Sequence, residues 1–185
     1  MGLALVLEKV YTVVDYGNMW GIVGRRPPSG VHGFIKGLEH MFLGQYNYSI
    51  DEKGRLTIPA RFRAALAAGA YVTQGFERNL LVYTTTSFEH IAAQTNSLST
   101  TNAEARDVRR VIFGRAADVS LDSAGRILIP AFLREYAGLD SEAEIVGAGV
   151  YFEIWSPKNW AEVLVSVTDA DKNAQRFSDF DLSVG

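Results

Sequence analysis

The sequence contains no cysteine, and its only histidines are His32, His40 and His90. Disulfide bonds, thiolate zinc sites and cysteine nucleophiles are therefore excluded. The three histidines do not show the spacing of metal ligands. No apolar run approaches the roughly 18 residues that a membrane-spanning helix needs. The apolar stretch at residues 3–7 follows no basic region, which argues against a signal peptide. We therefore expect a cytoplasmic protein.

An excess of positive charge is also missing. The 185 residues include 18 Lys and Arg against 21 Asp and Glu, which gives a formal net charge of −3. This balance excludes a uniformly basic nucleic-acid binder but is compatible with a local basic patch. The hydrophobic share of 48% and the charged share of 21% are typical of a globular protein. The length corresponds to one ordinary domain or two small ones.

The chain contains an internal repeat. Residues 46–66 align with residues 117–137 at an offset of 71, and eight of the 21 aligned positions are identical. About one identity is expected at background amino-acid frequencies. The similarity resumes where residues 80–88 align with residues 152–160. A unit of roughly 45 residues is too small to bury enough surface alone. We therefore expect the two copies to complete a single core together.

Each copy shows the same order of predicted elements. In the first, Tyr46, Tyr48 and Ile50 alternate with polar residues, which indicates a half-buried strand. Gly54 can adopt the left-handed conformation of a tight hairpin turn, and Pro59 suits the first turn of a helix. The pattern predicts strands at 46–50, 55–58, 70–73, 80–83, 119–121, 126–129, 143–147 and 151–155, and helices at 59–66, 87–93, 101–113, 130–136 and from 157 onward.

These elements define the predicted organisation of the chain. Residues 1–40 are rich in glycine and lack a sustained hydrophobic period, so they are predicted to be a disordered or mis-assigned extension. The remaining parts are a first unit at 45–87, a helical linker at 88–115, a second unit at 116–159 and a flexible tail at 166–185.

Both copies carry an Asp-x-x-Gly-Arg turn. In a structural interpretation the aspartate caps the turn and pairs with the arginine across it. In a functional interpretation the arginine presents its planar, bidentate guanidinium to phosphates or guanine edges. The two are compatible, because an aspartate can orient an arginine that contacts DNA. The residues concerned are Asp51, Gly54 and Arg55 in the first copy and Asp122, Gly125 and Arg126 in the second.

Other features bear on catalysis and on basic surfaces. No Gly-x-Ser-x-Gly motif or phosphate-binding loop is present, and an enzyme site rarely appears twice in one short chain. We therefore predict no enzyme, no metal and no other cofactor. Lys53 adds a charge to the first turn only. Further basic groups could form solvated faces, subunit contacts or DNA contacts; they are Arg61 and Arg63 after the first turn, and Arg106, Arg109, Arg110 and Arg115 on or beyond the central helix.

These motifs resemble the MraZ family. The likeness covers residues 41–165 and is carried by Met-Phe-Leu-Gly from Met41, by the segment 48–63 and by the segment 121–130. The family belongs to the AbrB-type swapped-hairpin class. The resemblance implies an α+β fold in which two tandem AbrB-like swapped-hairpin units form one pseudo-twofold small β-barrel with short flanking helices.

The resemblance also implies a function. MraZ proteins are sequence-specific DNA-binding transcriptional regulators of the division and cell wall gene cluster, usually repressors. They bind promoter direct repeats as homo-oligomeric rings and are placed in the cytoplasm on the nucleoid. The family's basic turn residues map first to Lys53 and Arg55 and then to Arg126, with Arg61 and Arg63 as further candidates for DNA binding. Neither a membrane nor a small-molecule substrate is implied.

Two expectations complete the sequence-based interpretation. Family members begin near the Met-Phe-x-Gly stretch, so we expect translation to start at Met41. The alternative to DNA binding is an oligomeric scaffold whose turns bind a protein partner. Salt-dependent, sequence-preferring DNA binding would discriminate between these two functions.

Overall fold

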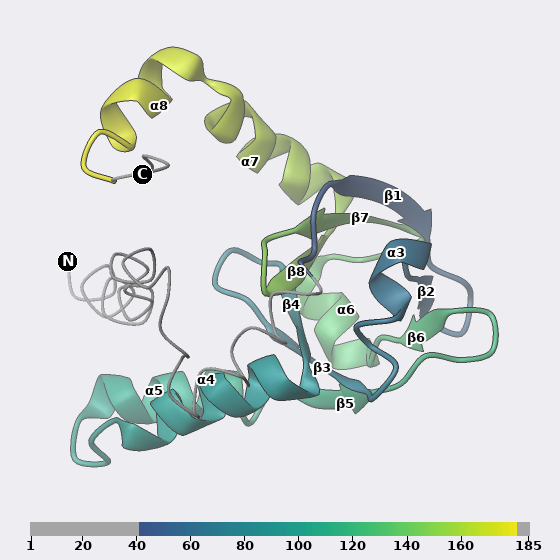
Figure 1. Ribbon diagram of the computed structural model, residues 1–185, viewed down its shortest axis with the longest axis horizontal. Coiled ribbons are helices and arrows are strands. Elements are labelled where there is room, and N and C mark those ends of the chain that lie inside the picture. Colours follow the sequence, from purple (N-terminus) through teal and green to yellow (C-terminus); the bar gives the residue numbers. More distant parts are fainter. Residues whose placement is uncertain (1–40, 181–185) are drawn as a thin grey trace, which may run out of the picture.

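The computed structural model describes residues 41–180, and Figure 1 shows them as sheets with flanking helices. The predicted α+β class is confirmed. The first half contains β1 (Gln45–Ser49), β2 (Arg55–Thr57), α3 (Ala60–Arg63), β3 (Ala70–Gln74), β4 (Leu80–Thr84) and α4 (Thr85–Ser97). The second half contains α5 (Ala103–Ile112), β5 (Ala117–Val119), β6 (Arg126–Leu128), α6 (Ala131–Ala137), β7 (Glu142–Gly147), β8 (Tyr151–Trp155), α7 (Pro157–Thr168) and α8 (Ala170–Arg176). The predicted extension at residues 1–40 lies outside the described residues.

The strands of the two copies interlock. A six-stranded sheet has the order β1-β7-β8-β4-β3-β5, and a two-stranded sheet pairs β2 with β6. All the pairs are antiparallel, and β1–β7, β2–β6, β3–β5 and β4–β8 each join one copy to the other. The six-strand order is symmetric about the β8–β4 pair, with β1 and β5 at its edges. Among the described residues these pairings form two sheets, and no closed barrel is defined by them.

The turns after β1 and β5 form as predicted, but the strands they join are not conventional hairpin partners. Strand β1 pairs along its whole length with β7, and β2 pairs with β6. Only one isolated bridge, between Ile50 and Leu56, links the two strands on either side of the first turn. The expected local hairpin is therefore replaced by pairing between the copies. This arrangement buries more apolar surface than a two-stranded hairpin could bury alone.

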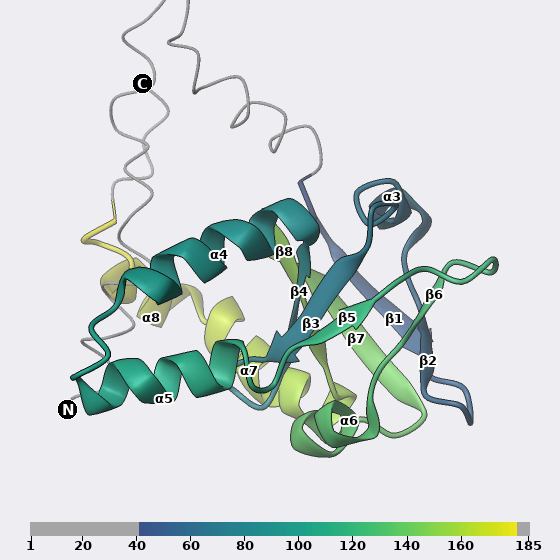
Figure 2. The ribbon, with the colours of Figure 1, turned by 90° about the horizontal axis from the view of Figure 1, so that it is seen from below.

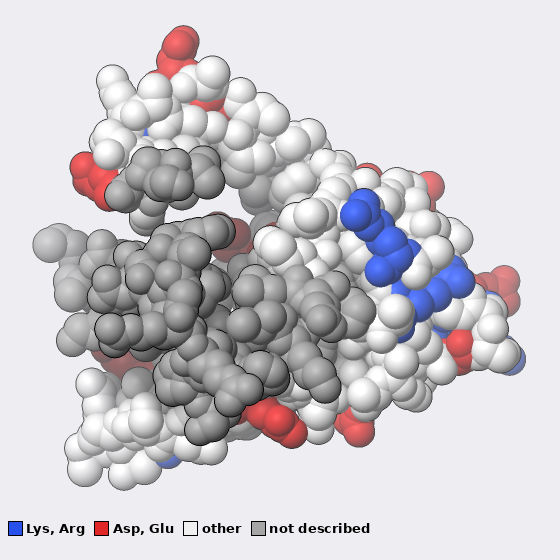
Figure 3. Space-filling model, viewed as in Figure 1, with Lys and Arg blue, Asp and Glu red and all other residues white. Residues whose placement is uncertain are grey.

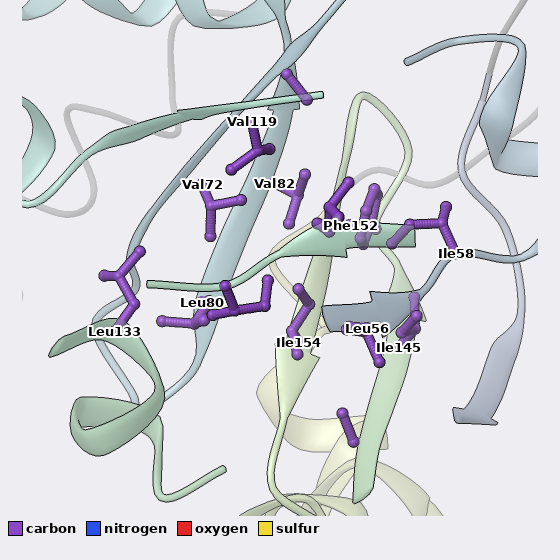
Figure 4. Close-up of a cluster of buried hydrophobic side chains, with 14 of the residues drawn as sticks. Leu56, Ile58, Val72, Leu80, Val82, Val119, Leu133, Ile145, Phe152 and Ile154 are labelled. Carbon is purple, nitrogen blue, oxygen red and sulfur yellow. The ribbon is translucent and has the colours of Figure 1, made fainter. Parts of the chain in front are cut away.

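The main core lies between the sheets and draws on both copies. Figure 4 shows side chains of β2, β3, β4, β7 and β8 converging with those of the neighbouring segments. In the two-stranded sheet of β2 and β6, here called the ribbon, the side chains of Leu56 and Ile127 point inward and are each at most 1% exposed. Its other side chains point outward because successive strand residues alternate between faces. The single core predicted from the repeat is thus confirmed by residues such as Phe62, Val72, Leu133 and Phe152.

Helices α4 and α5 form an antiparallel arm on one side of the sheet (Figures 1 and 2). The side chain of Thr84 caps α4 by accepting from the backbone N–H of Ser87. Helix α5 is capped by the side chain of Asn102, so it begins at Ala103 and is shorter than the helix predicted at 101–113. A second apolar cluster, which includes Tyr83, Phe88 and Ile112, joins this arm to the sheet.

The C-terminal part of the described chain is helical. Helix α7 begins at Pro157 behind the capping side chain of Ser156, and α8 follows it (Figure 1). The tail predicted to be flexible at 166–185 therefore includes the end of α7 and all of α8; its mobility stays a prediction. None of the helices described in residues 41–180 is long and apolar enough to cross a membrane.

Candidate nucleic-acid interface

The two Asp-x-x-Gly-Arg turns have the same internal hydrogen bonds. Asp51 Oδ1 accepts the backbone N–H groups of Lys53 and Arg55 at 3.0 and 2.9 Å. In the second copy, Asp122 Oδ1 accepts those of Ala124 and Arg126 at 2.9 and 3.0 Å. Each aspartate therefore caps its own turn and fixes the direction in which the following strand leaves it. This geometry is the one that the structural interpretation of the two aspartates describes.

The four charged residues of the turns also form one ionic network, here called the ionic tetrad: Asp51, Arg55, Asp122 and Arg126. Arg55 donates its Nε–H to Asp51 Oδ2 at 2.7 Å, and Arg126 does the same to Asp122 Oδ2 at 2.9 Å. Two salt bridges also join the copies. Arg126 Nη1 lies 3.4 Å from Asp51 Oδ2, and Arg55 Nη1 lies 3.9 Å from Asp122 Oδ2. The tetrad thus sets the relative position of the two turns.

The tetrad remains partly accessible to solvent. The two arginine side chains are 32% and 28% exposed, and the aspartates are 31% exposed. The hydrogen bond from the Arg55 side chain is the main cause that lowers the pKa of Asp51 from 3.8 to about 2. The corresponding bond from Arg126 lowers the pKa of Asp122, and Asp51 raises the pKa of Arg55. The charged form of every one of these three groups is therefore favoured in the folded protein.

The lowered pKa of Asp51 predicts a specific pH dependence of stability. A carboxyl group whose pKa is lower in the folded than in the unfolded chain stabilises the fold above its unfolded pKa. That contribution is lost as the pH falls through the folded pKa, here between about 4 and about 2. We expect Asp51→Asn, which keeps the accepting oxygen but not the charge, to be less stable than the wild type at neutral pH. The gap in free energy of unfolding should close as the pH falls through this window.

Urea titrations followed by circular dichroism at several pH values would measure this gap. Asp107→Asn is the matched control, because Asp107 pairs with Arg110 on the exposed side of α5 and both side chains are about 70% exposed. The control should show a small effect at every pH. A stability gap for Asp51→Asn that does not change with pH would contradict an electrostatic role for Asp51.

Each turn is covered by an arginine from the helix of the other copy. Gly54 and Gly125 are buried and adopt left-handed backbone angles, with φ of 79° and 75°. A Cβ added at Gly125 would meet the guanidinium of Arg63, and one at Gly54 would meet that of Arg134. Backbone hydrogen bonds also join each turn to the other copy. Ile58 N–H donates to Gly125 O, and Ile129 N–H donates to Gly54 O. A side chain at either glycine would therefore be strained by the positive φ and would displace the covering arginine.

Basic residues therefore lie at both ends of the two-stranded sheet. Arg63 and Arg61 lie at one end, and Arg134 and Lys53 lie at the other. Arg63 and Arg134 are fixed by Nε–H donation to Ile58 O and Ile129 O at 2.9 and 3.1 Å. Arg61 is exposed on α3 and donates to the Tyr46 hydroxyl at 3.1 Å. Lys53 is exposed on the first turn, next to Gly54 and hence to Arg134. Figure 3 shows Lys and Arg side chains gathering on the side of the molecule where α3 lies.

The tertiary structure thus brings together the nine residues of the two turns and of α3 that the sequence singled out, but not the arginines of the central helix. We call this region the turn surface and define it as residues 51–55 and 122–126 with the outward side chains of β2, β6, α3 and α6. Sequence reasoning did not select Arg134, although the repeat aligns it with Arg63. It also passed over Leu128, an exposed leucine on β6. The repeat alignment could have identified Arg134. The exposure of Leu128 could be known only once the pairing of β2 with β6 was known.

The arginines of the central helix lie elsewhere. Helix α5 is at the far end of the molecule from β2 and β6 in both ribbon views (Figures 1 and 2). Arg109 donates to the carbonyl oxygens of Thr95, Asn96 and Leu98 at the end of α4. Arg106 donates to two carbonyl oxygens of the α4–α5 loop. These two side chains therefore stabilise the helical arm by donating to carbonyl oxygens at the end of α4 and in the loop before α5.

Comparison with known proteins gives the family. The model of the MraZ protein family matches twice in tandem, at residues 41–111 and 112–181, so the chain holds two tandem copies of this domain. The chain is similar to proteins named transcriptional regulator MraZ. The one from Roseiflexus castenholzii is 49% identical over 138 residues, covering 75% of this chain and 94% of the relative. The one from Moorella thermoacetica is 41% identical over 143 residues, covering 77% of this chain and 100% of the relative. Two tandem family matches and relatives at this level of identity establish that the chain belongs to the MraZ family.

Proposed function

We propose that this protein is a DNA-binding transcriptional regulator that contacts duplex DNA through its turn surface. The observation that carries the proposal is the ionic tetrad, which holds two arginine-bearing turns side by side on one exposed two-stranded ribbon. A two-stranded β-ribbon has the dimensions to enter the major groove. The names of the similar proteins support regulation of transcription rather than catalysis.

The local charge of the turn surface favours DNA although the whole chain is acidic. The two turns with α3 and α6 hold four acidic side chains and six basic ones, namely Lys53, Arg55, Arg61, Arg63, Arg126 and Arg134. Within the tetrad, aspartate and arginine charges balance, so the surplus comes from the flanking basic residues. We propose that Lys53, Arg61 and Arg63 bind phosphates, while Arg55 and Arg126, held in position by the aspartates, reach base edges.

The finer features of the proposal follow from the family resemblance. They are repression of the division and cell wall gene cluster, binding to promoter direct repeats, and assembly of swapped-hairpin subunits into a homo-oligomeric ring in the cytoplasm on the nucleoid. In a ring, several turn surfaces can engage successive repeats, and linked weak contacts gain from a high effective concentration. An acidic subunit can then bind DNA tightly through a small basic area.

A mobility-shift titration on the DNA upstream of the protein's own gene tests the proposal. We expect binding that a scrambled duplex of equal length does not compete away and that weakens with salt. Between about 50 and about 200 mM salt, the affinity should fall about 3.5-fold for each phosphate contacted. Arg61→Gln should lower the salt slope by about one for each subunit engaged. Arg110→Gln is the matched control, since Arg110 is 71% exposed on α5.

The control variant should keep the wild-type salt slope, because α5 lies away from the turn surface. If DNA binding depends on neither the salt concentration nor the DNA sequence, the proposed function is wrong and the alternative of a protein-interaction scaffold is favoured. Equal effects of Arg61→Gln and Arg110→Gln would instead move the interface away from the turn surface.

A further inference from the structure

Leu128 is an exposed leucine among the charged residues of the turn surface. Its side chain is 55% exposed, whereas that of the preceding Ile127 is 1% exposed in the core. The register of the ribbon places Leu128 directly opposite Arg55. Directly opposed residues in an antiparallel pair point to the same face, with Cβ atoms about 5 Å apart. The leucine therefore lies beside an arginine of the ionic tetrad, on the face that we propose meets DNA.

The repeat shows that the strand does not require an apolar residue at this position. Leu128 aligns with Thr57, which is the Cα partner of Arg126 in the same ribbon. The two positions are thus equivalent, each next to one arginine of the tetrad. One carries a small polar side chain and the other a large apolar one. The difference makes the turn surface chemically asymmetric at its centre.

We propose that Leu128 contacts the C5-methyl group of a thymine next to the site of Arg55, and so gives the protein a preference for thymine there. This inference rests on the proposed DNA binding and specifies part of its sequence preference. In the major groove the thymine methyl is the apolar group of the base edges, and aliphatic side chains recognise it by direct contact. Removing one such methyl group from water changes affinity about fourfold.

The surroundings of Leu128 favour a nucleic acid over a second protein chain as its occupant. The cores of protein interfaces are depleted in charged residues. Here the leucine lies within a ribbon whose outward side chains include Arg55 and Arg126 and whose turns carry Asp51, Lys53 and Asp122. An apolar side chain beside arginines matches the methyl-bearing edge of a thymine, which is flanked by phosphates.

The test compares two duplexes of the DNA upstream of the protein's gene, one with thymine and one with deoxyuridine in its place. Deoxyuridine lacks the methyl group but keeps the hydrogen-bonding edge. The full-length wild-type protein should bind the thymine duplex about fourfold more tightly for each methyl group contacted. Leu128→Ser should bind the two duplexes equally. Leu43→Ser is the matched control, because Leu43 is 47% exposed before β1 and outside the ribbon, and it should keep the wild-type ratio.

Four other outcomes would overturn the inference. A Leu128→Ser variant that keeps the wild-type thymine preference would show that another residue reads the methyl group. Wild-type protein that binds both duplexes equally would show that no methyl group is read, while leaving the proposed DNA binding intact. Loss of oligomers in Leu128→Ser, seen by sedimentation with an unchanged thymine preference, would assign the leucine to a subunit contact. Absence of binding to either duplex would instead remove the proposed function, and the inference with it.

Discussion

Replacing Arg55 with alanine is expected to weaken binding to the upstream DNA by about 10- to 100-fold, the range of one good bidentate contact to a base. In an oligomer that engages several repeats, the loss recurs in every subunit and the measured effect is larger. Arg55 holds both aspartates of the tetrad, by hydrogen bonds to Asp51 and by the longer link to Asp122. The substitution therefore removes both the proposed DNA contact and the group that positions the turns.

A second variant separates these two contributions. Arg55→Lys keeps the positive charge near both aspartates but loses the planar fork that a bidentate contact needs. We expect its unfolding temperature to lie between those of the wild type and Arg55→Ala, because lysine keeps the charge but not the paired contacts to Asp51, whereas its DNA affinity falls nearly as far as that of Arg55→Ala. Arg110→Ala on α5 serves as the charge-matched control and should bind normally. Wild-type affinity of Arg55→Ala in a correctly assembled oligomer would exclude the first turn from the interface.

The second large effect is expected in the core. Phe62→Ala should lower the free energy of unfolding by about 3–5 kcal/mol, the usual range for a buried phenylalanine. Phe62 is 1% exposed and is the buried residue of α3. Its ring lies 4.9 Å from that of Phe42 and 5.4 Å from that of Phe152, measured between centroids. A four-residue helix is not stable by itself, so Phe62 keeps α3 and its arginines in place.

Chemical denaturation would measure the loss, and DNA titration of the folded variant would show its effect on function. Phe76→Ala is the matched control because Phe76 is 41% exposed, and it should change stability by less than about 1 kcal/mol. We expect Phe62→Ala to weaken DNA binding even under conditions in which it is folded, since Arg61 and Arg63 lie on the same helix. A loss of stability no larger than that of the control would show that α3 is held by other contacts.

The local chemistry of the turns could be predicted well from the sequence. Asp51 and Asp122 accept the backbone N–H groups that the Asp-x-x-Gly-Arg pattern indicated. Gly54 and Gly125 adopt the positive φ that such a turn requires. These features depend on residues within five positions of one another, so short-range sterics and hydrogen bonding decide them.

The partner of each strand could not be predicted from the turn itself. The pattern around residues 46–58 indicates a local hairpin, yet β1 pairs with β7 and β2 pairs with β6. The two copies present nearly the same alternation of apolar residues, so a strand can satisfy its backbone groups with either. Burial decides between them, because pairing across the copies encloses one common core that neither copy could form alone.

The sequence by itself therefore determined the duplication, the conformation of the two turns and the family. The tertiary structure decided which charges act together. Arg63 covers the turn of the other copy, Arg55 and Arg126 share two aspartates, and Leu128 is left exposed beside Arg55. Each of these contacts joins residues that are more than 60 positions apart in the chain. No local pattern encodes them, because their energies arise only when the two copies pack around the same core.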